Sequence, residues 1–448
     1  MRAFVALLAL ALAGLVWYLL PSRAEPVAAG PEAEILRRPA EAPVRAPAKD
    51  DAPAPMDPAQ VVKRQEALRL NERALALLEQ DDPSGAEALL RQACVLEPED
   101  RVLAVNLSRT RVRLGRIAAD AGHAAEALAW FRAAAAADAD ACAPAEWEIS
   151  LQLRRGERAE AKRLVLESLR AFPGAAGLHR LRGEIAFLEG DLAAAVESYA
   201  AAARTDASEA TRARLAQLEE EQRAFSHYLT DATAHCDSRY DPDDAPLVAR
   251  MSALHAELEL AWLQVVNLLG VPTQDRLLVI WLSPKRYRGA APEWSSGLYD
   301  GRVRILVSEG SGVDDALRAT LRHELTHAVL HALDGRLPTW LHEGLAQRSE
   351  GRSVEAVRAR LRRQELTVDA AALAADWTAW TDADRLAEAY GLALSFVVWL
   401  EERYGSSAIP SLLLGLRAAD FESAWNAVFV RSLAELEGEH RLWLASGS

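Results

Sequence analysis

The stretch LRHELTHAVLHAL, residues 321–333, holds three histidines and a glutamate at spacings that could bind a metal ion. On a helix, His323 and His327 are four residues apart, so both imidazoles project from one face about a turn apart. That spacing lets two ring nitrogens reach one zinc ion at ~2.0–2.1 Å. Glu324 is turned about 100° around the axis. It is therefore a poor third ligand but well placed to accept a proton from an attacking water.

A second segment, LPTWLHEGLAQ at 337–347, offers the missing ligand. Pro338 favours the start of a helix, and Glu343 falls in its first turns. Catalytic zinc is typically held by three protein ligands, with a fourth position left open. Glu343 can be the third ligand, whereas the adjacent His342 is expected to point off the ligand face. We expect Glu350, also acidic and nearby, to be uninvolved.

Several elements must position these side chains. Asp314 and Asp315 can cap the start of the histidine helix, and Gly335 can end it. Upstream, LLVIWL (277–282) is a continuous apolar run of strand length, and RVRILV (302–307) alternates apolar and polar residues. The apolar positions of the second run are expected on one face of an edge strand that could align an extended peptide; they are Val303, Ile305 and Val307.

HELTH followed by PTWLHEGLA resembles the gluzincin metallopeptidases, in particular the bacterial peptidase MA-like domains with a W-L-x-E-G-x-A element. The resemblance covers roughly 223–445. It includes GLYDGRVRILV (297–307), AYGLALSFVVWLEERYG (389–405) and SLAELEGEHRLWL (432–444). It implies a thermolysin-like α+β fold for residues 223–448, Zn²⁺ as cofactor, and hydrolysis of peptide or protein substrates.

The resemblance also implies roles for individual residues. His323, His327 and Glu343 would be the zinc ligands, and Glu324 the general base. Tyr390 would steady the oxyanion, although a packing tyrosine in an apolar helix is an equally good reading. The third histidine of the helix, at position 331, is expected to be an ordinary helix residue. A metzincin would need histidine at 333 and glycine at 330, and both positions are leucine.

The chain before this domain repeats. Four segments, 85–98, 125–139, 159–173 and 193–207, each carry an alanine followed four residues later by a larger apolar residue. The pairs are Ala86/Leu90, Ala127/Phe131, Ala161/Val165 and Ala195/Tyr199. The last two intervals between the alanines are both 34 residues, the period of tetratricopeptide repeats, which this region resembles. We expect an α-solenoid of helical hairpins over 59–222.

Within that solenoid the polar helix 209–225 is expected to act as a cap. Such repeats commonly bind a partner protein in a groove, but they can also serve as a spacer.

The N-terminus predicts export. Residues 3–20 contain no charged residue and suit a signal anchor in the membrane or a cleaved signal peptide. Residues 21–58 are rich in proline and alanine and contain no aromatic residue, as expected of a disordered linker. The soluble part would then lie outside the cytoplasm, periplasmic and tethered to the inner membrane through residues 1–20, or secreted.

Composition excludes one class of partner. The formal net charge of −14 and the pI near 5.3 argue against nucleic-acid binding, which needs a basic face. The sequence therefore predicts a membrane-tethered zinc metallopeptidase with repeats that recruit substrate or partner proteins. The main alternative is an interaction scaffold whose peptidase-like domain is catalytically idle. Metal-dependent hydrolysis of a bond other than a peptide bond is a further alternative.

Overall fold

The computed structural model resolves the chain into two compact units, which we name the repeat unit and the sheet unit. The structure describes residues 58–271, 276–286, 297–308, 310, 312–333, 337–375, 377, 380, 382–417 and 419–446. Among these, the repeat unit comprises 58–187 and 193–217, and the sheet unit comprises 188–192 and 218–446. The expected anchor and linker, 1–20 and 21–58, lie outside the described residues except for Pro58. No helix in the described part of the chain has the length and apolarity needed to span a membrane.

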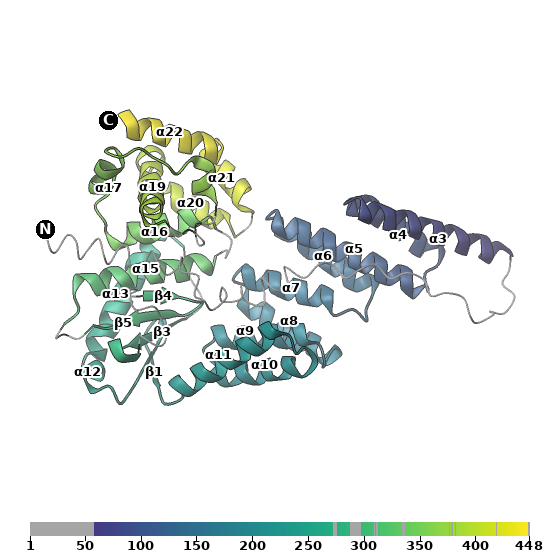
Figure 1. Cartoon of the computed structure of the whole chain (residues 1–448), viewed down its shortest axis with the longest axis horizontal. Coiled ribbons are helices and arrows are strands. Elements are labelled where there is room, and N and C mark those ends of the chain that lie inside the picture. The colour runs from purple at the N-terminus through teal and green to yellow at the C-terminus, as the bar shows by residue number, and fades with distance from the viewer. Residues whose placement is uncertain are drawn as a thin grey trace. The chain divides into compact units, whose positions relative to one another are not determined.

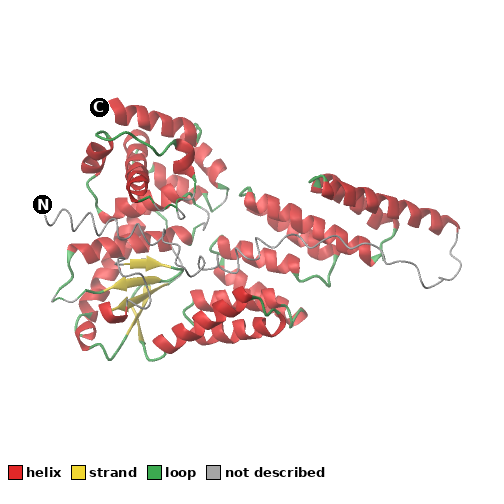
Figure 2. Ribbon diagram, in the orientation of Figure 1, coloured by secondary structure: helices red, strands yellow, loops and turns green. Residues whose placement is uncertain are grey.

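Residues 58–225 form successive helices joined by short turns (Figures 1 and 2). They are α3 (Pro58–Glu79), α4 (Pro83–Leu96), α5 (Arg101–Asp120), α6 (Ala124–Ala137), α7 (Ala143–Arg154), α8 (Arg158–Ala171), α9 (Ala176–Leu188), α10 (Leu192–Thr205) and α11 (Glu209–Phe225). The last of these coincides with the polar helix predicted from the sequence.

Small residues allow neighbouring helices of the repeat unit to pack closely. The four repeated alanines are completely buried; they are Ala86, Ala127, Ala161 and Ala195. A Cβ atom at Gly115 would lie 2.5 Å from the ring of Phe131, and one at Gly183 would lie 2.6 Å from the ring of Tyr199. Only glycine fits at these two positions, because an aromatic ring from the neighbouring helix occupies the space that a Cβ atom would need.

The sheet unit is built on a small mixed sheet. Its strands are β1 (Leu229–Ala232), β2 (Cys236–Tyr240), β3 (Leu277–Leu282), β4 (Gly297–Tyr299) and β5 (Val303–Leu306), in the order β1-β2-β3-β5-β4. Pairing is parallel between β2 and β3 and between β3 and β5, and antiparallel at both ends. Every residue of β3 is buried, as its uninterrupted apolar sequence predicted.

The expectation that Val303, Ile305 and Val307 form an edge strand is wrong. β5 pairs with β3 on one side and with β4 on the other, so it is an inner strand. All three side chains are buried in the core. Alternation of apolar residues shows that one face is buried, but it does not show whether a neighbouring strand lies alongside. Among the described strands, the edge on this side is β4.

Helices cover the sheet and complete the unit. They are α12 (Ala245–Val248), α13 (Met251–Leu269), α15 (Asp315–His331), α16 (Thr339–Glu350), α17 (Val354–Leu361), α18 (Ala370–Ala374), α19 (Ala383–Tyr404), α20 (Ala408–Gly415), α21 (Phe421–Phe429) and α22 (Leu433–Ser446). Helix α15 contacts α13, α16, β4 and β5 (Figure 1). One apolar core joins the sheet to these helices and includes the fully buried Trp281.

The two helices with the candidate ligands begin where the sequence predicts. The Asp314 side chain accepts a hydrogen bond from Leu317 N at 2.8 Å, which caps the start of α15. Helix α16 starts directly after Pro338. In α16, a Cβ atom at Gly344 would lie 2.7 Å from Ala393 O in α19, so this glycine allows close contact between the helices.

The boundary between the units falls inside α11. Its residues up to 217 belong to the repeat unit, and those from Leu218 onward belong to the sheet unit. Leu218 is completely buried, and Glu221 is 8% exposed. The boundary predicted from the sequence, between 222 and 223, lies five residues later.

Candidate metal centre

Two imidazoles and one carboxylate converge between α15 and α16. His323 Nε2 and His327 Nε2 are 3.1 Å apart. Glu343 reaches both, with Oε1 3.7 Å from His327 Nε2 and Oε2 3.9 Å from His323 Nε2. These are the three candidate ligands predicted from the sequence, and the fold brings them together.

The donor atoms fit a zinc ion. Tetrahedral zinc with ligand bonds of ~2.0–2.2 Å places its donors about 3.3–3.6 Å apart, close to the observed 3.1–3.9 Å. In addition, Glu343 Oε2 is buried and has no hydrogen-bond partner among the described residues. A buried carboxylate oxygen without a donor is costly, and a cation between the three groups would satisfy it.

Hydrogen bonds join helices α15 and α16 beside the candidate site. Arg322 of α15 donates to Ser349 O at 2.6 Å and to Glu350 O at 2.7 Å at the end of α16. Thr326 Oγ1 donates to Ser349 Oγ at 2.9 Å. These contacts fix the register of the helices, on which the convergence of the ligands depends.

Glu350 is a partner of the site, and the expectation that it is uninvolved is wrong. His323 Nδ1 donates to Glu350 Oε1 at 2.5 Å, which turns Nε2 toward the other ligands. Arg352 in turn holds the Glu350 carboxylate. No spacing rule in the sequence distinguished this glutamate, because it approaches α15 from the last turn of a different helix.

The two candidate ligand histidines have pKa values shifted in opposite directions. Burial disfavours the charged form of His323, but the hydrogen bond and charge of Glu350 outweigh it and raise the pKa of His323 to about 9. Burial, followed by repulsion from His323, His342 and His331, holds the pKa of His327 well below its usual value. His327 is therefore already in the neutral form that binds metals, whereas His323 must release a proton.

Glu324 lies beside the edge strand. A Cβ atom at Gly297 of β4 would lie 2.6 Å from Glu324 Cγ and 2.7 Å from Glu324 Oε1, so the strand backbone contacts this side chain directly. Burial raises the pKa of Glu324 to about 7; the charge of His323 opposes this shift, and those of Glu343 and Glu350 add to it. A carboxylate with a pKa near neutrality is suited to accept a proton.

Tyr390 of α19 reaches the site from the side of Glu343. Burial raises the pKa of Glu343 to about 7, and His323 and a hydrogen bond with Tyr390 are among the groups that oppose the shift. Gln347 Nε2 donates to Glu343 O at 3.1 Å and to Tyr390 O at 2.9 Å, which ties α16 to α19. The ring of Tyr390 also packs against Trp377, as expected of the packing role considered from the sequence; the oxyanion role stays a prediction.

The other two histidines of these helices stand next to the ligands. The His342 ring centroid is 5.8 Å from that of His327, and burial followed by the charge of His331 lowers the pKa of His342 to about 4. His331 lies at the end of α15 and meets the ring of Tyr299 edge-on at 5.6 Å. Neither belongs to the group of three converging ligand atoms.

Another set of potential ligands lies in the sheet unit, at His227, Asp241 and Asp243. Here the buried carboxylate already has partners. Asp241 accepts from Arg286 Nη2 at 3.0 Å, and His227 Nε2 lies 3.2 Å from Asp241 Oδ1. This group therefore offers no unsatisfied carboxylate comparable to that of Glu343.

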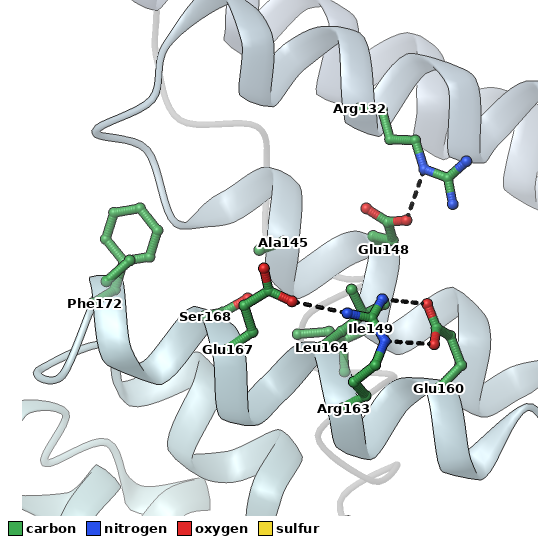
Figure 3. Close-up of a pocket in the computed structure, with 11 residues that line it drawn as sticks. Arg132, Ala145, Glu148, Ile149, Glu160, Arg163, Leu164, Glu167, Ser168 and Phe172 are labelled. Carbon is green, nitrogen blue, oxygen red and sulfur yellow. Dashed lines mark hydrogen bonds and ion pairs between the residues drawn. The ribbon is translucent and has the colours of Figure 1, made fainter.

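The repeat unit carries a hollow of about 410 Å³ between α6, α7 and α8 (Figure 3). Its lining includes five charged side chains and the apolar Ile149 and Leu164. Arg163 bridges Glu160 and Glu167, and the remaining pair joins Arg132 to Glu148 (Figure 3). These five charges satisfy one another without any ligand.

A comparison with known protein families finds no matching family model, and no curated protein matches the sequence. The geometry of the site and the sequence motifs therefore carry the functional argument.

Proposed function

We propose that the chain is a zinc-dependent metallopeptidase with its active site at His323, His327 and Glu343. The supporting observation is the convergence of these three donors next to Glu324, a carboxylate outside the converging group. It includes a buried Glu343 oxygen that has no hydrogen-bond partner among the described residues. Three protein ligands leave one coordination position for water or substrate, which is the arrangement of catalytic zinc rather than structural zinc.

Zinc in this site would supply Lewis-acid polarisation of the scissile carbonyl and a lowered pKa for the attacking water. Glu324 would take the proton of that water, since it is near the ligands and its pKa is raised to about 7. Tyr390, which approaches Glu343, would donate a hydrogen bond to the oxyanion. Glu350 would keep His323 oriented throughout.

Strand β4 supports a peptide as the substrate. It pairs with β5 on one side, and among the described strands its other side is not paired. Its first residue, Gly297, touches the proposed base Glu324. An extended peptide that added to this edge by backbone hydrogen bonds would run past the base and the ligands.

The finer architecture belongs to the same proposal. The sheet unit would be a thermolysin-like domain, and the helical hairpins would be tetratricopeptide repeats that recruit a substrate or partner protein. Close packing at Gly115 and Gly183 supports the repeat assignment. The apolar residues 3–20 would tether the protein to a membrane, with the two units outside the cytoplasm.

A reporter fused after Pro58 should then be active only outside the cytoplasm.

The test separates metal binding from chemistry. Glu324→Gln in the full chain preserves the shape of the side chain but removes the base. It should keep about one zinc per chain and abolish cleavage of denatured casein. The matched control is Glu355→Gln, an exposed glutamate of α17, which should keep both properties. A Glu324→Gln protein as active as the parent would contradict the proposal, and a parent that binds zinc but cleaves no peptide would favour the scaffold alternative.

A further inference from the structure

Two arginines are buried in the hairpin that carries the edge strand. Arg302 lies in the turn between β4 and β5, and its side chain is fully buried. Arg304 lies in β5 and is 5% exposed. A guanidinium group cannot lose its charge at accessible pH, so each needs an anionic partner inside the protein.

Glu221 of α11 is the partner they share. Its Oε1 accepts hydrogen bonds from Nη2 of Arg302 and from Nη2 of Arg304, the latter at 2.9 Å. Asp300 accepts a second pair of bonds from Arg304, at 3.1 and 2.7 Å. Two carboxylates and two guanidinium groups thus form a cluster whose formal charges cancel. Glu221 and both arginines are buried, whereas the Asp300 side chain is 31% exposed. Partial burial opposes ionisation of Asp300, but the charges of the two arginines outweigh it and keep the pKa of Asp300 below its usual value.

The hairpin carries this cluster at one end and touches the metal centre at the other. From Asp300 the chain runs back through Tyr299, whose ring meets His331 of α15, to Gly297, which contacts Glu324. Residue pairing within the hairpin is continuous, from Tyr299 opposite Val303 to Gly297 opposite Ile305. A displacement at the turn would therefore shift the strand along the proposed base.

We propose that Glu221 is a positioning residue for the active site: by neutralising Arg302 and Arg304 it holds the β4–β5 hairpin in the register in which β4 receives the substrate. The inference rests on the proposed peptidase function. It assigns to α11, a helix expected only to cap the repeats, a role in substrate binding.

The expected displacement follows from the high cost of breaking a buried ion pair. Loss of one member leaves the others with an uncompensated charge away from water, which is far more costly than loss of an exposed pair. With Glu221 neutralised, the hairpin can relieve this cost by moving its arginines toward solvent. That movement draws β4 away from Glu324, while the zinc ligands, which lie on α15 and α16, stay in place.

The kinetic test compares Glu221→Gln with Glu220→Gln in the full chain. Glu220 precedes Glu221 on the same helix and is exposed. Glu221→Gln should raise KM for an extended peptide by at least about tenfold and leave zinc at about one per chain, because the strand that binds substrate is displaced. Glu220→Gln should match the parent. If Glu221 only stabilised the fold, its substitution would lower the fraction of active protein, and hence the apparent kcat, without changing KM. That result would overturn the inference.

Hydrogen exchange gives a readout that does not depend on activity. In Glu221→Gln the backbone amides of 297–306 should exchange at least about tenfold faster than in the parent, whereas those of β2 and α13 should not change. Unchanged exchange in the hairpin overturns the inference, whether or not the parent is a peptidase. If the parent cleaves no peptide but the hairpin amides of Glu221→Gln still exchange faster, the positioning role is confirmed and the failure lies in the proposed function.

Charge balance provides the rescue experiment. Adding Arg302→Gln to Glu221→Gln removes one buried positive charge along with the negative one, so the cluster returns to neutrality. The double variant should regain a lower KM and slower exchange of the hairpin amides than Glu221→Gln alone. Additive losses in the double variant would contradict a role through charge compensation.

Discussion

Two groups of charged side chains in this molecule differ in how they are satisfied. In the hollow of the repeat unit, the carboxylates of Glu160 and Glu167 both bind Arg163, and the hydrogen bond with Arg163 lowers the pKa of Glu160 (Figure 3). In the metal centre, burial instead raises the pKa of both Glu324 and Glu343 to about 7. Each carboxylate of the first group has a guanidinium partner, whereas the second group contains a buried Glu343 oxygen with no hydrogen-bond partner among the described residues.

This difference favours the candidate metal centre, rather than the hollow, as the place where a ligand binds. Exposed ion pairs are close to neutral in energy and need nothing further. Buried carboxylates without enough counter-charge destabilise the fold unless a cation binds, so a site of this kind is a candidate functional site. The two regions can be tested against each other with matched substitutions.

The largest difference in zinc affinity is expected for substitution of Glu343, a proposed zinc ligand. Glu343→Ala leaves two histidines, so zinc affinity should fall by more than about 100-fold, given that loss of an outer partner alone costs 10–100-fold. Peptidase activity should disappear with the metal. Zinc content after dialysis against a competing chelator measures the effect. Glu148→Ala in the hollow is the control, and equal zinc loss in that variant would remove the distinction between the two regions.

Zinc binding should depend on pH in a direction set by the site. His323, with a pKa of about 9, and Glu343, with a pKa of about 7, hold protons that zinc must displace. At least one proton is displaced throughout pH 6 to 8, so affinity should rise with pH by at least about 100-fold over that range. Chelator competition at several pH values measures it. An affinity independent of pH would mean that these groups are not the ligands.

Glu350→Ala should weaken the site without dismantling it. The variant removes the acceptor for His323 Nδ1, so the ring loses its orientation, and zinc affinity should fall by about 10–100-fold. The control is Glu355→Ala, which removes an exposed carboxylate a few residues away. If both variants bind zinc like the parent, Glu350 does not orient the ligand.

Gly297→Ala should affect turnover more than metal binding. The added Cβ would collide with Glu324, so the base must shift while the ligands remain; kcat should fall about tenfold at unchanged zinc content. Gly312→Ala is the control, since a Cβ there meets no atom within 4 Å. Loss of zinc in Gly297→Ala would show that the strand supports the ligands rather than the base.

The smallest effect on stability is expected for a substitution in the hollow of the repeat unit. Glu160→Gln breaks an exposed pair with Arg163, whose side chain is 57% exposed, so the melting temperature should stay within the error of measurement. Zinc content should also stay the same. A clear loss of stability would show that the charges of the hollow hold the repeat helices together.

Local features of this protein were predictable from the sequence. The run 277–282 coincides with β3, the cap at Asp314 forms, and His323 and His327 meet because a helix brings residues four apart onto one face. The spacing of the repeated alanines likewise marked buried helix positions, since all four are completely buried. Each of these depends on the geometry of one element or of adjacent elements.

Tertiary structure decided the features that join distant segments. It made β4 rather than β5 the edge strand, brought Glu350 onto His323, and placed Glu221 against the arginines of the hairpin. No periodicity encodes these contacts, because each joins side chains from separate elements whose approach is set by packing of the whole core. The sequence by itself therefore determined which residues could hold a metal ion, and only the packed fold determined which charges surround them and which strand runs past them.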